Sequence, residues 1–347
     1  MSILKRWQFW LGIAISAAFL YDVLGKLDLA DAWAVARSAN YWWIIPGVAV
    51  YFVAVWARTW RWHYMLRPIK RVPLRRLFPV VVIGYMGNNV YPFRAGEVIR
   101  AYVLKRKEDV SISASLATVI VERIFDGVTM LFFVFVVLPI APEAAEWRGI
   151  VIWFSILFFG VLAAFFLIAA SPRRSQVLAG WFIQRIVPAR FRAPAENITG
   201  RFLEGLHCLR SGKDVLMIFV TSVAIWLTET TKYWFVMHAF DFTVSFFVLM
   251  LMTAVVNLAT TLPSSPGYVG TFDWPGIKVL QGFGVNQSIA ASYTLVLHAA
   301  LWFPITLLGF FYMWRESVTW SQFAEAAKMK RGNSVSDTEP SCKDTQE

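Results

Sequence analysis

Ten ionisable side chains lie inside long apolar segments of this sequence, where an isolated charge is expensive. At the centre of a membrane-spanning helix each charge costs roughly 2.5–3.5 kcal/mol unless it is paired or faces water. Groups of this kind bind charged solutes, relay protons or hold helices together. The cations are as many as the carboxylates, and the set consists of Arg94, Arg100, Arg123, Lys232, Lys278, Glu97, Glu122, Asp126, Glu229 and Asp273.

Glu122 and Asp126 are four residues apart, which places both carboxylates on one face of a helix, with Arg123 beside them. Their position near the middle of an apolar stretch predicts that they face the protein interior or water. In a purely structural interpretation, this group bridges to Arg94 or Lys232 and only holds helices together. We favour a functional interpretation, in which arginines bind a phosphate and carboxylates line the site.

Glu229 and Lys232 are three residues apart and can form an ion pair within one helix. Glu97 belongs to the first turn expected for a helix that begins near residue 95. An acid there interacts favourably with the helix dipole and needs no further role.

A cluster of glycine, asparagine and proline predicts a break in the helix between residues 88 and 94. Pro92 lacks a backbone donor and disfavours helical geometry at Tyr91. A second helix starting near Ala95 or Gly96 would direct its N–H groups and positive dipole end at the break, which suits a phosphate. The candidate binding residues of this segment are Asn88, Asn89, Pro92, Arg94, Gly96, Glu97 and Arg100.

A second cluster repeats these features between residues 263 and 275. Asp273 is a candidate N-cap, with Pro275 in the first turn of the helix that follows. The alternative for both clusters is an ordinary turn between helices. The candidate binding residues here are Pro263, Pro266, Gly267 and Asp273.

The composition of the chain indicates that membrane helices position these residues. The chain has 347 residues, of which 58% are hydrophobic and 16% charged, and its mean hydropathy is +0.55. Globular chains are about 45–50% apolar and about 25% charged, so a bilayer is the expected environment. No nucleic-acid motif, P-loop or metal-ligand spacing occurs, so we expect no cofactor, metal or nucleic-acid partner.

Six apolar stretches are long enough to cross a bilayer, which takes about 20 helical residues. Two further stretches, 79–104 and 246–283, are apolar but broken by the glycine and proline clusters. The expected spans are 7–24, 41–60, 113–140, 150–170, 215–237 and 288–314.

Lysine and arginine concentrate in one set of connections, which the positive-inside rule assigns to the cytoplasm. That set includes Arg58, Arg61, Arg67 and residues 70–76, and it places both termini in the cytoplasm. The broken stretches then enter and leave from the same side and form re-entrant hairpins of opposite sense. The sequence thus predicts an all-α protein of the prokaryotic inner membrane with inverted halves, about 1–140 and 149–315. Residues 171–214 form a basic cytoplasmic linker, and residues 316–347 form a disordered tail.

The run from Gly87 to Tyr102 resembles the signature G-N-x-x-x-P-x-R-A-G-E-x-x-R-x-Y of the lysylphosphatidylglycerol synthase transmembrane, or flippase-like, family. Residues 122–126 resemble its E-R-x-x-D helix, Glu229 matches an acid of the family, and residues 262–267 match its second proline-glycine segment. Two features depart from the family: Tyr268 and Asp273 stand where it usually has a glycine and a glutamate, and we expect no fused aminoacyl-transferase domain after Arg315.

The resemblance implies a flippase that moves a phospholipid or a lipid-linked phosphate headgroup between leaflets without ATP. It also implies that the chain does not synthesise lysylphosphatidylglycerol. Two other functions stay open: a membrane transferase acting on a lipid phosphate or polyprenyl carrier, with Glu97, Glu122 or Asp126 as general base, and a non-transporting partner of a lipid-modifying enzyme. The candidate binding residues deeper in the chain are Glu122, Arg123, Asp126, Glu229 and Lys232.

Overall fold

The computed structural model of this chain is all-helical, and no strand occurs among the residues it describes. Among the described residues, three helical segments are long and apolar enough to cross a membrane: Tyr41–Leu66, Gly212–Met237 and Gln287–Arg315. The expected all-α class is therefore confirmed. The described residues are 7–25, 27–91, 94–137, 156, 159–160, 163, 177, 180–185, 188–205, 209, 211–262 and 264–316.

Helices follow one another with short connections wherever the chain is described continuously. Two single 3-10 turns, η2 (Tyr41–Trp43) and η5 (Pro266–Tyr268), supplement them. The α-helices are α1 (Trp7–Leu24), α2 (Leu29–Ser38), α3 (Ile44–Leu66), α4 (Leu74–Val90), α5 (Ala95–Glu108), α6 (Ile112–Val137), α9 (Ala189–Gly205), α10 (Gly212–Met237), α11 (Phe246–Ala259), α12 (Asp273–Gly282) and α13 (Gln287–Arg315).

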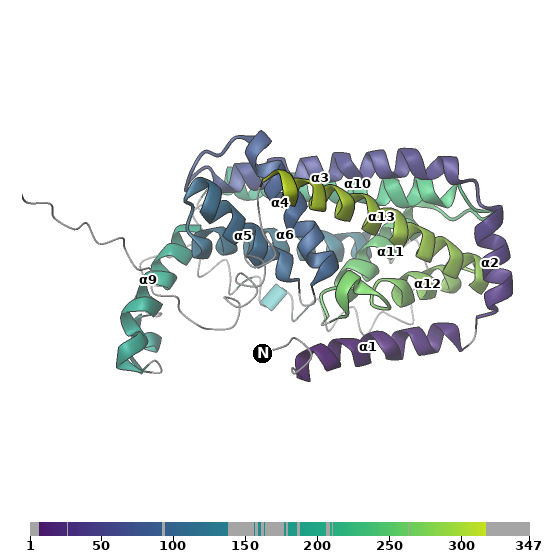
Figure 1. The fold of residues 1–347 in the computed structure, drawn as a ribbon, viewed down its shortest axis with the longest axis horizontal. Helices are drawn as coiled ribbons and strands as arrows, with labels where there is room; N and C mark the ends of the chain where they lie inside the picture. The colour runs from purple at the N-terminus through teal and green to yellow at the C-terminus, as the bar shows by residue number, and fades with distance from the viewer. Residues whose placement is uncertain are drawn as a thin grey trace, which may run out of the picture.

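Two long helices, α3 and α10, lie side by side along one edge of the bundle (Figure 1). Helix α13 packs against α4 and α12, and α2 lies across one end of the bundle. There the Ser292 hydroxyl of α13 donates a hydrogen bond of 2.7 Å to the carbonyl of Ala32. These long helices form the frame against which two shorter helical hairpins pack.

The first hairpin consists of α4 and α5, which begin and end at the same end of the bundle. Arg76 near the start of α4 and Glu108 at the end of α5 are 3.1 Å apart. The two helices approach so closely that a Cβ atom on Gly96 would overlap the carbonyl oxygen of Gly84. Only glycine fits at this contact, so the backbones of α4 and α5 touch directly.

The second hairpin consists of α11, the 3-10 turn η5 and α12, and it begins and ends at the opposite end of the bundle (Figure 1). Ser245 caps α11 by accepting from the N–H of Val248. Within η5, Gly267 has a φ of 73°, in the left-handed region that favours glycine. Its turn sends the chain back toward α12.

The tips of the two hairpins meet beside the middle of α13. The Arg94 guanidinium of the first tip lies 3.4 Å from the hydroxyl of Thr260 and about 6.0 Å from the ring of Tyr268, both in the second tip. The Asn89 amide donates a hydrogen bond of 2.8 Å to the hydroxyl of Thr306 on α13. The broken segments of the sequence therefore come together in space.

Several expected boundaries agree with this structure. Helix α4 ends at Val90 and α5 begins at Ala95, which confirms the break expected between residues 88 and 94. Helix α3 continues to Leu66, six residues beyond the expected span end at residue 60. Pro92, Pro263, most of the span 150–170 and residues 317–347 lie outside the described part of the chain.

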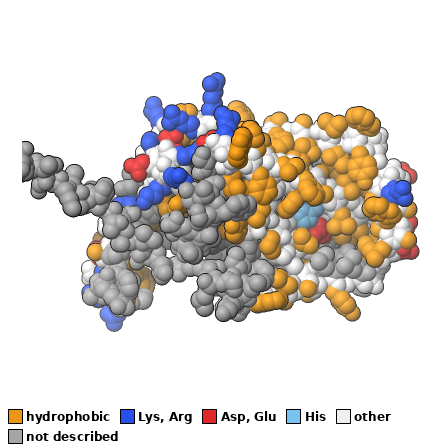
Figure 2. Space-filling model, in the orientation of Figure 1, with side chains coloured by type: hydrophobic (Ala, Val, Ile, Leu, Met, Phe, Trp, Pro, Cys, Tyr) orange, Lys and Arg blue, Asp and Glu red, His pale blue; other side chains and the backbone are white. Residues whose placement is uncertain are grey.

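The surface divides into a basic end and a broad apolar region. Figure 2 shows lysine and arginine side chains gathered over the end where α4 begins and α5 ends, with hydrophobic side chains over most of the remaining described surface. Large apolar residues that remain exposed include Trp56, Phe132, Leu307 and Phe311. Such an exposed apolar surface fits a membrane protein.

Candidate functional site

Two buried arginines project from α3 toward the centre of the bundle. Arg58 is 6% exposed and Arg61 is 1% exposed, and they lie about one helical turn apart. Both were expected in a cytoplasmic connection, although Arg58 also falls within the expected span 41–60. Because α3 continues past residue 60, both arginines lie in one helix and are buried inside the protein.

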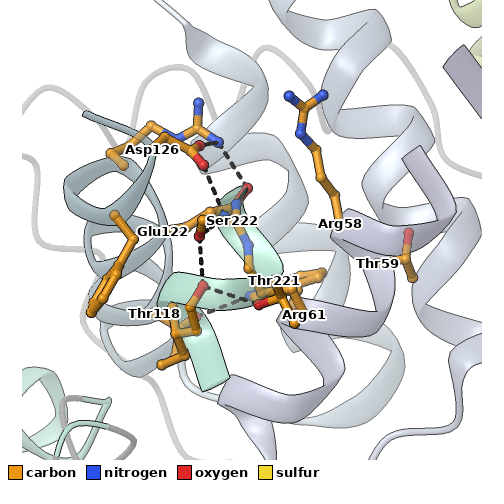
Figure 3. Close-up of polar contacts among 12 residues, drawn as sticks. Arg58, Thr59, Arg61, Thr118, Glu122, Asp126, Thr221 and Ser222 are labelled. Carbon is orange, nitrogen blue, oxygen red and sulfur yellow. Dashed lines mark hydrogen bonds and ion pairs between the residues drawn. The ribbon is translucent and has the colours of Figure 1, made fainter. Parts of the chain in front are cut away.

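Arg61 joins three helices through its side-chain contacts. Its Nη1 donates to Oδ1 of Asp126 on α6 at 2.8 Å and to the hydroxyl of Ser222 on α10 at 2.5 Å. The indole of Trp226 on α10 donates to the same Asp126 oxygen at 2.9 Å. Figure 3 shows Glu122 and Asp126 of α6 directed toward Arg61 and Ser222.

Glu122 lies at the centre of this inner ion cluster. Its carboxylate is 2.5 Å from Arg100 Nη2, 2.7 Å from Arg123 Nη2 and 3.3 Å from Arg61 Nη2. The residue is 1% exposed, and Arg100 also stacks 4.7 Å above the ring of Trp62. A buried carboxylate surrounded by three arginines is held as the anion.

A second ion cluster surrounds Glu229 on α10. Its carboxylate pairs with Arg58 Nη1 at 2.5 Å and with the ammonium of Lys232, one turn along the same helix. The Lys232 ammonium lies 4.4 Å from the ring centre of Tyr51, and the Arg58 guanidinium lies 4.5 Å from that of Trp226. The expected Glu229–Lys232 pair is therefore confirmed, with Arg58 as an additional partner.

A cavity of about 140 Å³, lined by both charged and apolar side chains, lies where these clusters meet the hairpin tips. A single water needs about 10–15 Å³ by this measure, so the cavity admits a group much larger than one water. Residues of both hairpins, α3, α6, α10 and α13 form its wall. The wall includes Tyr51, Arg58, Tyr85, Asn88, Asn89, Arg94, Arg123, Trp226, Glu229, Lys232, Tyr233, Asn257, Thr260, Gly267, Tyr268, Phe272, His298, Leu301 and Trp302.

Cations outnumber carboxylates on the described cavity wall. Arg58, Arg94, Arg123 and Lys232 line it, against the single carboxylate of Glu229. Glu97 is not part of the described wall, but its Oε1 lies 3.7 Å from Arg94 Nη1 and 3.8 Å from Arg123 Nε. The wall therefore has a positive character that suits an anionic group.

The cavity has a deep end and a more open end. Glu229 and Lys232 are nearly inaccessible, with exposures of 2% and 4%. The Arg123 side chain retains 33% exposure and that of Arg94 23%. A solute therefore reaches the two exposed arginines first and the Glu229 cluster last.

His298 of α13 connects the second hairpin to the cavity wall. Its Nδ1 lies 2.8 Å from Oδ1 of Asp273, and its Nε2 lies 2.8 Å from the carbonyl oxygen of Gly267. The ring also packs 4.4 Å from the ring of Phe272. One side chain thus fixes both the turn η5 and the start of α12.

The residues proposed from sequence divide into three groups. One group lines the cavity: Asn88, Asn89, Arg94, Arg123, Glu229, Lys232 and Gly267. A second group is absent from the described cavity wall: Gly96, Glu97, Arg100, Glu122, Asp126, Pro266 and Asp273. Pro92 and Pro263 lie outside the described residues.

Two N–H groups near the starts of the half-helices are already used within the hairpins. The N–H of Gly96 donates to the side-chain oxygen of Asn88 at 2.9 Å, and the N–H of Gly270 donates to Asp273 at 2.9 Å. These two donors are therefore occupied, and the cations that the wall offers to an anion are Arg58, Arg94, Arg123 and Lys232.

Two further expectations need correction. Asp273 is not an N-cap: it is the first residue of α12, whose N-cap is Phe272, although Pro275 does lie in the first turn. The partners of Glu122 are Arg61, Arg100 and Arg123, rather than Arg94 or Lys232.

Sequence reasoning missed the aromatic and histidine parts of the wall as well as Arg58. The available signal was the apolar run after residue 60, which includes Trp62 and Met65 and extends the span over both arginines. The tyrosines, by contrast, occupy ordinary helical core positions. Their approach to one cavity depends on how distant helices pack.

Comparison with known proteins agrees with this architecture. The chain is similar to a UPF0104 membrane protein of Methanothermobacter thermautotrophicus, with 25% identity over 86% of this chain and 91% of the relative. It is 21% identical to one of Methanocaldococcus jannaschii, over 87% and 93% of the two chains. It is also 25% identical to the glycosyltransferase AglD of Haloferax volcanii, covering 77% of this chain but only 47% of AglD.

A family model described as the lysylphosphatidylglycerol synthase TM region matches residues 9–309, which include every helix from α2 to α12 and most of α1 and α13. The resemblance noted from the hairpin motif is thereby confirmed. The chain belongs to the lysylphosphatidylglycerol synthase transmembrane-region family.

Proposed function

We propose that this protein moves an anionic phospholipid or lipid-linked phosphate headgroup between the two leaflets of a membrane. The observation that carries the proposal is the cavity where two hairpin tips meet, whose described wall presents four cations and one carboxylate. A charged headgroup needs such a compensating environment to cross the hydrocarbon layer.

The proposed topology has six full spans and two re-entrant hairpins in inverted halves, with both termini in the cytoplasm. Two features support it. The hairpin α4–α5 enters and leaves at the basic end, and the hairpin α11–α12 at the opposite end. Both tips stop beside the middle of α13, where irregular backbone is tolerated only if protein buries it or a wet cavity faces it.

Each part of the site has a role in this proposal. Arg94 and Arg123 receive the phosphate at the open end of the cavity. Arg58 and Lys232 bind it deeper, where both can exchange their contact with Glu229 for a contact with the ligand. The sequence contains no P-loop, and in this proposal a lipid or ion gradient or the membrane potential drives transport.

Transport of a fluorescent anionic lipid in proteoliposomes tests the proposal. We expect Arg94→Ala to lower the translocation rate by roughly tenfold or more, because it removes a charge that contacts the headgroup. Glu122→Ala should also impair transport, because three arginines lose their common partner. Arg37→Ala, in the exposed part of α2, is the control and should keep the full rate. Unchanged transport in both site variants would refute the assignment of the site.

A membrane transferase acting on a lipid phosphate or polyprenyl carrier is the second candidate. The similarity to part of a glycosyltransferase, AglD, favours it. The carboxylates expected as general base argue against it, since Glu122 and Asp126 are engaged by arginines. Product formation by purified protein from lipid donors would establish the transferase, as would loss of that product in Glu97→Gln.

A further inference from the structure

The buried ion network around the cavity carries a surplus of positive charge. Its described members fall into two connected groups, each with one more cation than carboxylate. Arg58 and Lys232 share Glu229. The second group connects Arg61, Arg94, Arg100 and Arg123 to Glu97, Glu122 and Asp126.

Both groups reach the same cavity, so their surplus charges add at one place. Arg58 and Lys232 form its deep end, and Arg94 and Arg123 form its open end. Asp273 pairs with His298 at the second hairpin and is absent from the described cavity wall. Two uncompensated positive charges in a largely buried site call for a ligand with two negative charges.

The same arginines still have hydrogen-bond donors to offer. The Nε groups of Arg58 and Arg94 are buried and have no hydrogen-bond acceptor among the described residues, and that of Arg123 has only Glu97, at 3.8 Å. Arg58 is itself 6% exposed, so its unpaired donor cannot be satisfied at the protein surface. A buried donor without an acceptor costs about 1–3 kcal/mol, which a phosphate oxygen would recover.

The composition of the wall also excludes one kind of headgroup. A cationic headgroup, such as an aminoacylated lipid, requires carboxylates, and the described wall offers only Glu229, which Arg58 and Lys232 already contact. A phosphodiester lipid brings one negative charge and would leave one positive charge uncompensated. A phosphate monoester brings about two above pH 6, together with three terminal oxygens.

We infer that the headgroup bound in this cavity is a dianionic phosphate, a monoester or diphosphate at the end of a lipid, in preference to a phosphodiester. This inference rests on the proposed function for its transport consequences only. Binding of the phosphate group follows from the cavity itself.

Direct binding tests the preference without any assumption about transport. The full chain in detergent micelles is titrated at pH 8 with fluorescent phosphatidic acid and with fluorescent phosphatidylglycerol of identical acyl chains, and fluorescence polarisation is measured. We expect about tenfold tighter binding of phosphatidic acid, the monoester. Equal affinity, or tighter binding of phosphatidylglycerol, would overturn the inference.

The pH dependence of the affinity ratio of the two lipids is a second measurement on the same protein. The second ionisation of a phosphate monoester has a pKa near 6, whereas a diester keeps one charge throughout. The affinity ratio should therefore rise between pH 5 and pH 8, and a flat ratio would count against the inference. The charged and titratable groups that face the cavity or pair with its wall are Tyr51, Arg58, Tyr85, Arg94, Glu97, Glu122, Arg123, Asp126, Glu229, Lys232, Tyr233, Tyr268, Asp273 and His298.

A matched pair of variants connects the preference to the surplus charge. Arg94→Gln removes one of the two uncompensated charges and should bring the affinity ratio close to one. Arg37→Gln removes an arginine from exposed α2 and should leave the ratio unchanged. A ratio that is as high in Arg94→Gln as in the unaltered protein would refute the role of the surplus.

Two controls separate the remaining explanations. Inorganic phosphate as a competitor should displace the lipid only at millimolar concentrations, and displacement at micromolar concentrations would overturn the assignment to a lipid. In proteoliposomes, equal movement of both lipids contradicts the preference alone. Absence of movement for either lipid contradicts the proposed transport, while the binding titration still decides the inference.

Discussion

At the scale of single residues, Arg61 illustrates how one side chain can hold a membrane bundle together. Its guanidinium contacts Glu122 and Asp126 of α6 and Ser222 of α10. Such a contact stabilises the protein less by its attraction than by the high cost of leaving its partners unpaired in a buried place.

We expect Arg61→Gln to destabilise the protein by about 3–5 kcal/mol, the usual cost of removing one partner from a buried ion pair. Arg76→Gln is the matched control, because the Arg76 side chain is 68% exposed in its pair with Glu108. An exposed pair contributes about 0–1 kcal/mol. Unfolding in mixtures of detergent and sodium dodecyl sulfate measures both, and equal effects would contradict the structural role of Arg61.

At the scale of elements, the hairpin α4–α5 depends on direct contact between two backbones. Gly96 lies against Gly84 and Asn88 without room for a methyl group, and Asn88 closes the turn by accepting from the Gly96 N–H. The hairpin thus places Asn89 and Arg94 at its tip with little freedom.

We expect Gly96→Ala to separate the two helices and to destabilise the protein by about 1–3 kcal/mol, as overpacking does. Gly282→Ala, at the end of α12, is the control, because a methyl group there meets nothing within 4 Å. Apparent melting temperature in detergent compares the two variants. A Gly96→Ala protein as stable as the control would show that the contact is not required.

At the scale of the whole molecule, the two ends of the bundle should lie on opposite sides of the membrane. Arg76 belongs to the basic end, and Arg37 belongs to α2 at the other end. In a protein whose Cys208 and Cys342 are replaced by serine, Arg76→Cys should react with an impermeant maleimide only from the cytoplasm. Arg37→Cys should react only from outside. Labelling of both from one side would refute the proposed topology.

Part of this architecture follows directly from sequence, and part does not. The hairpin breaks and the helical class follow from local chemistry, since proline, glycine and asparagine disfavour helix at residues 88–94 wherever the segment lies. The end of α3 at Leu66 does not follow from sequence, because Arg58 and Arg61 look like the basic flank of a membrane span as long as their buried partners are unknown. Asp126 and Glu229 are 65 and 171 residues away from the arginines they neutralise. No local pattern connects residues that far apart.

The glycine contact in the first hairpin also governs which part of the protein can rearrange. Where the main chains of two helices touch, no layer of side chains between them can slide or repack. We therefore expect α4 and α5 to move together as one rigid body. The second hairpin packs instead through side chains such as Met252 and Phe272, and it also receives hydrogen bonds from His298 on α13 and Ser16 on α1. Contacts between side chains can repack where two main chains in direct contact cannot, so a movement that opens the cavity should involve the second hairpin rather than the first.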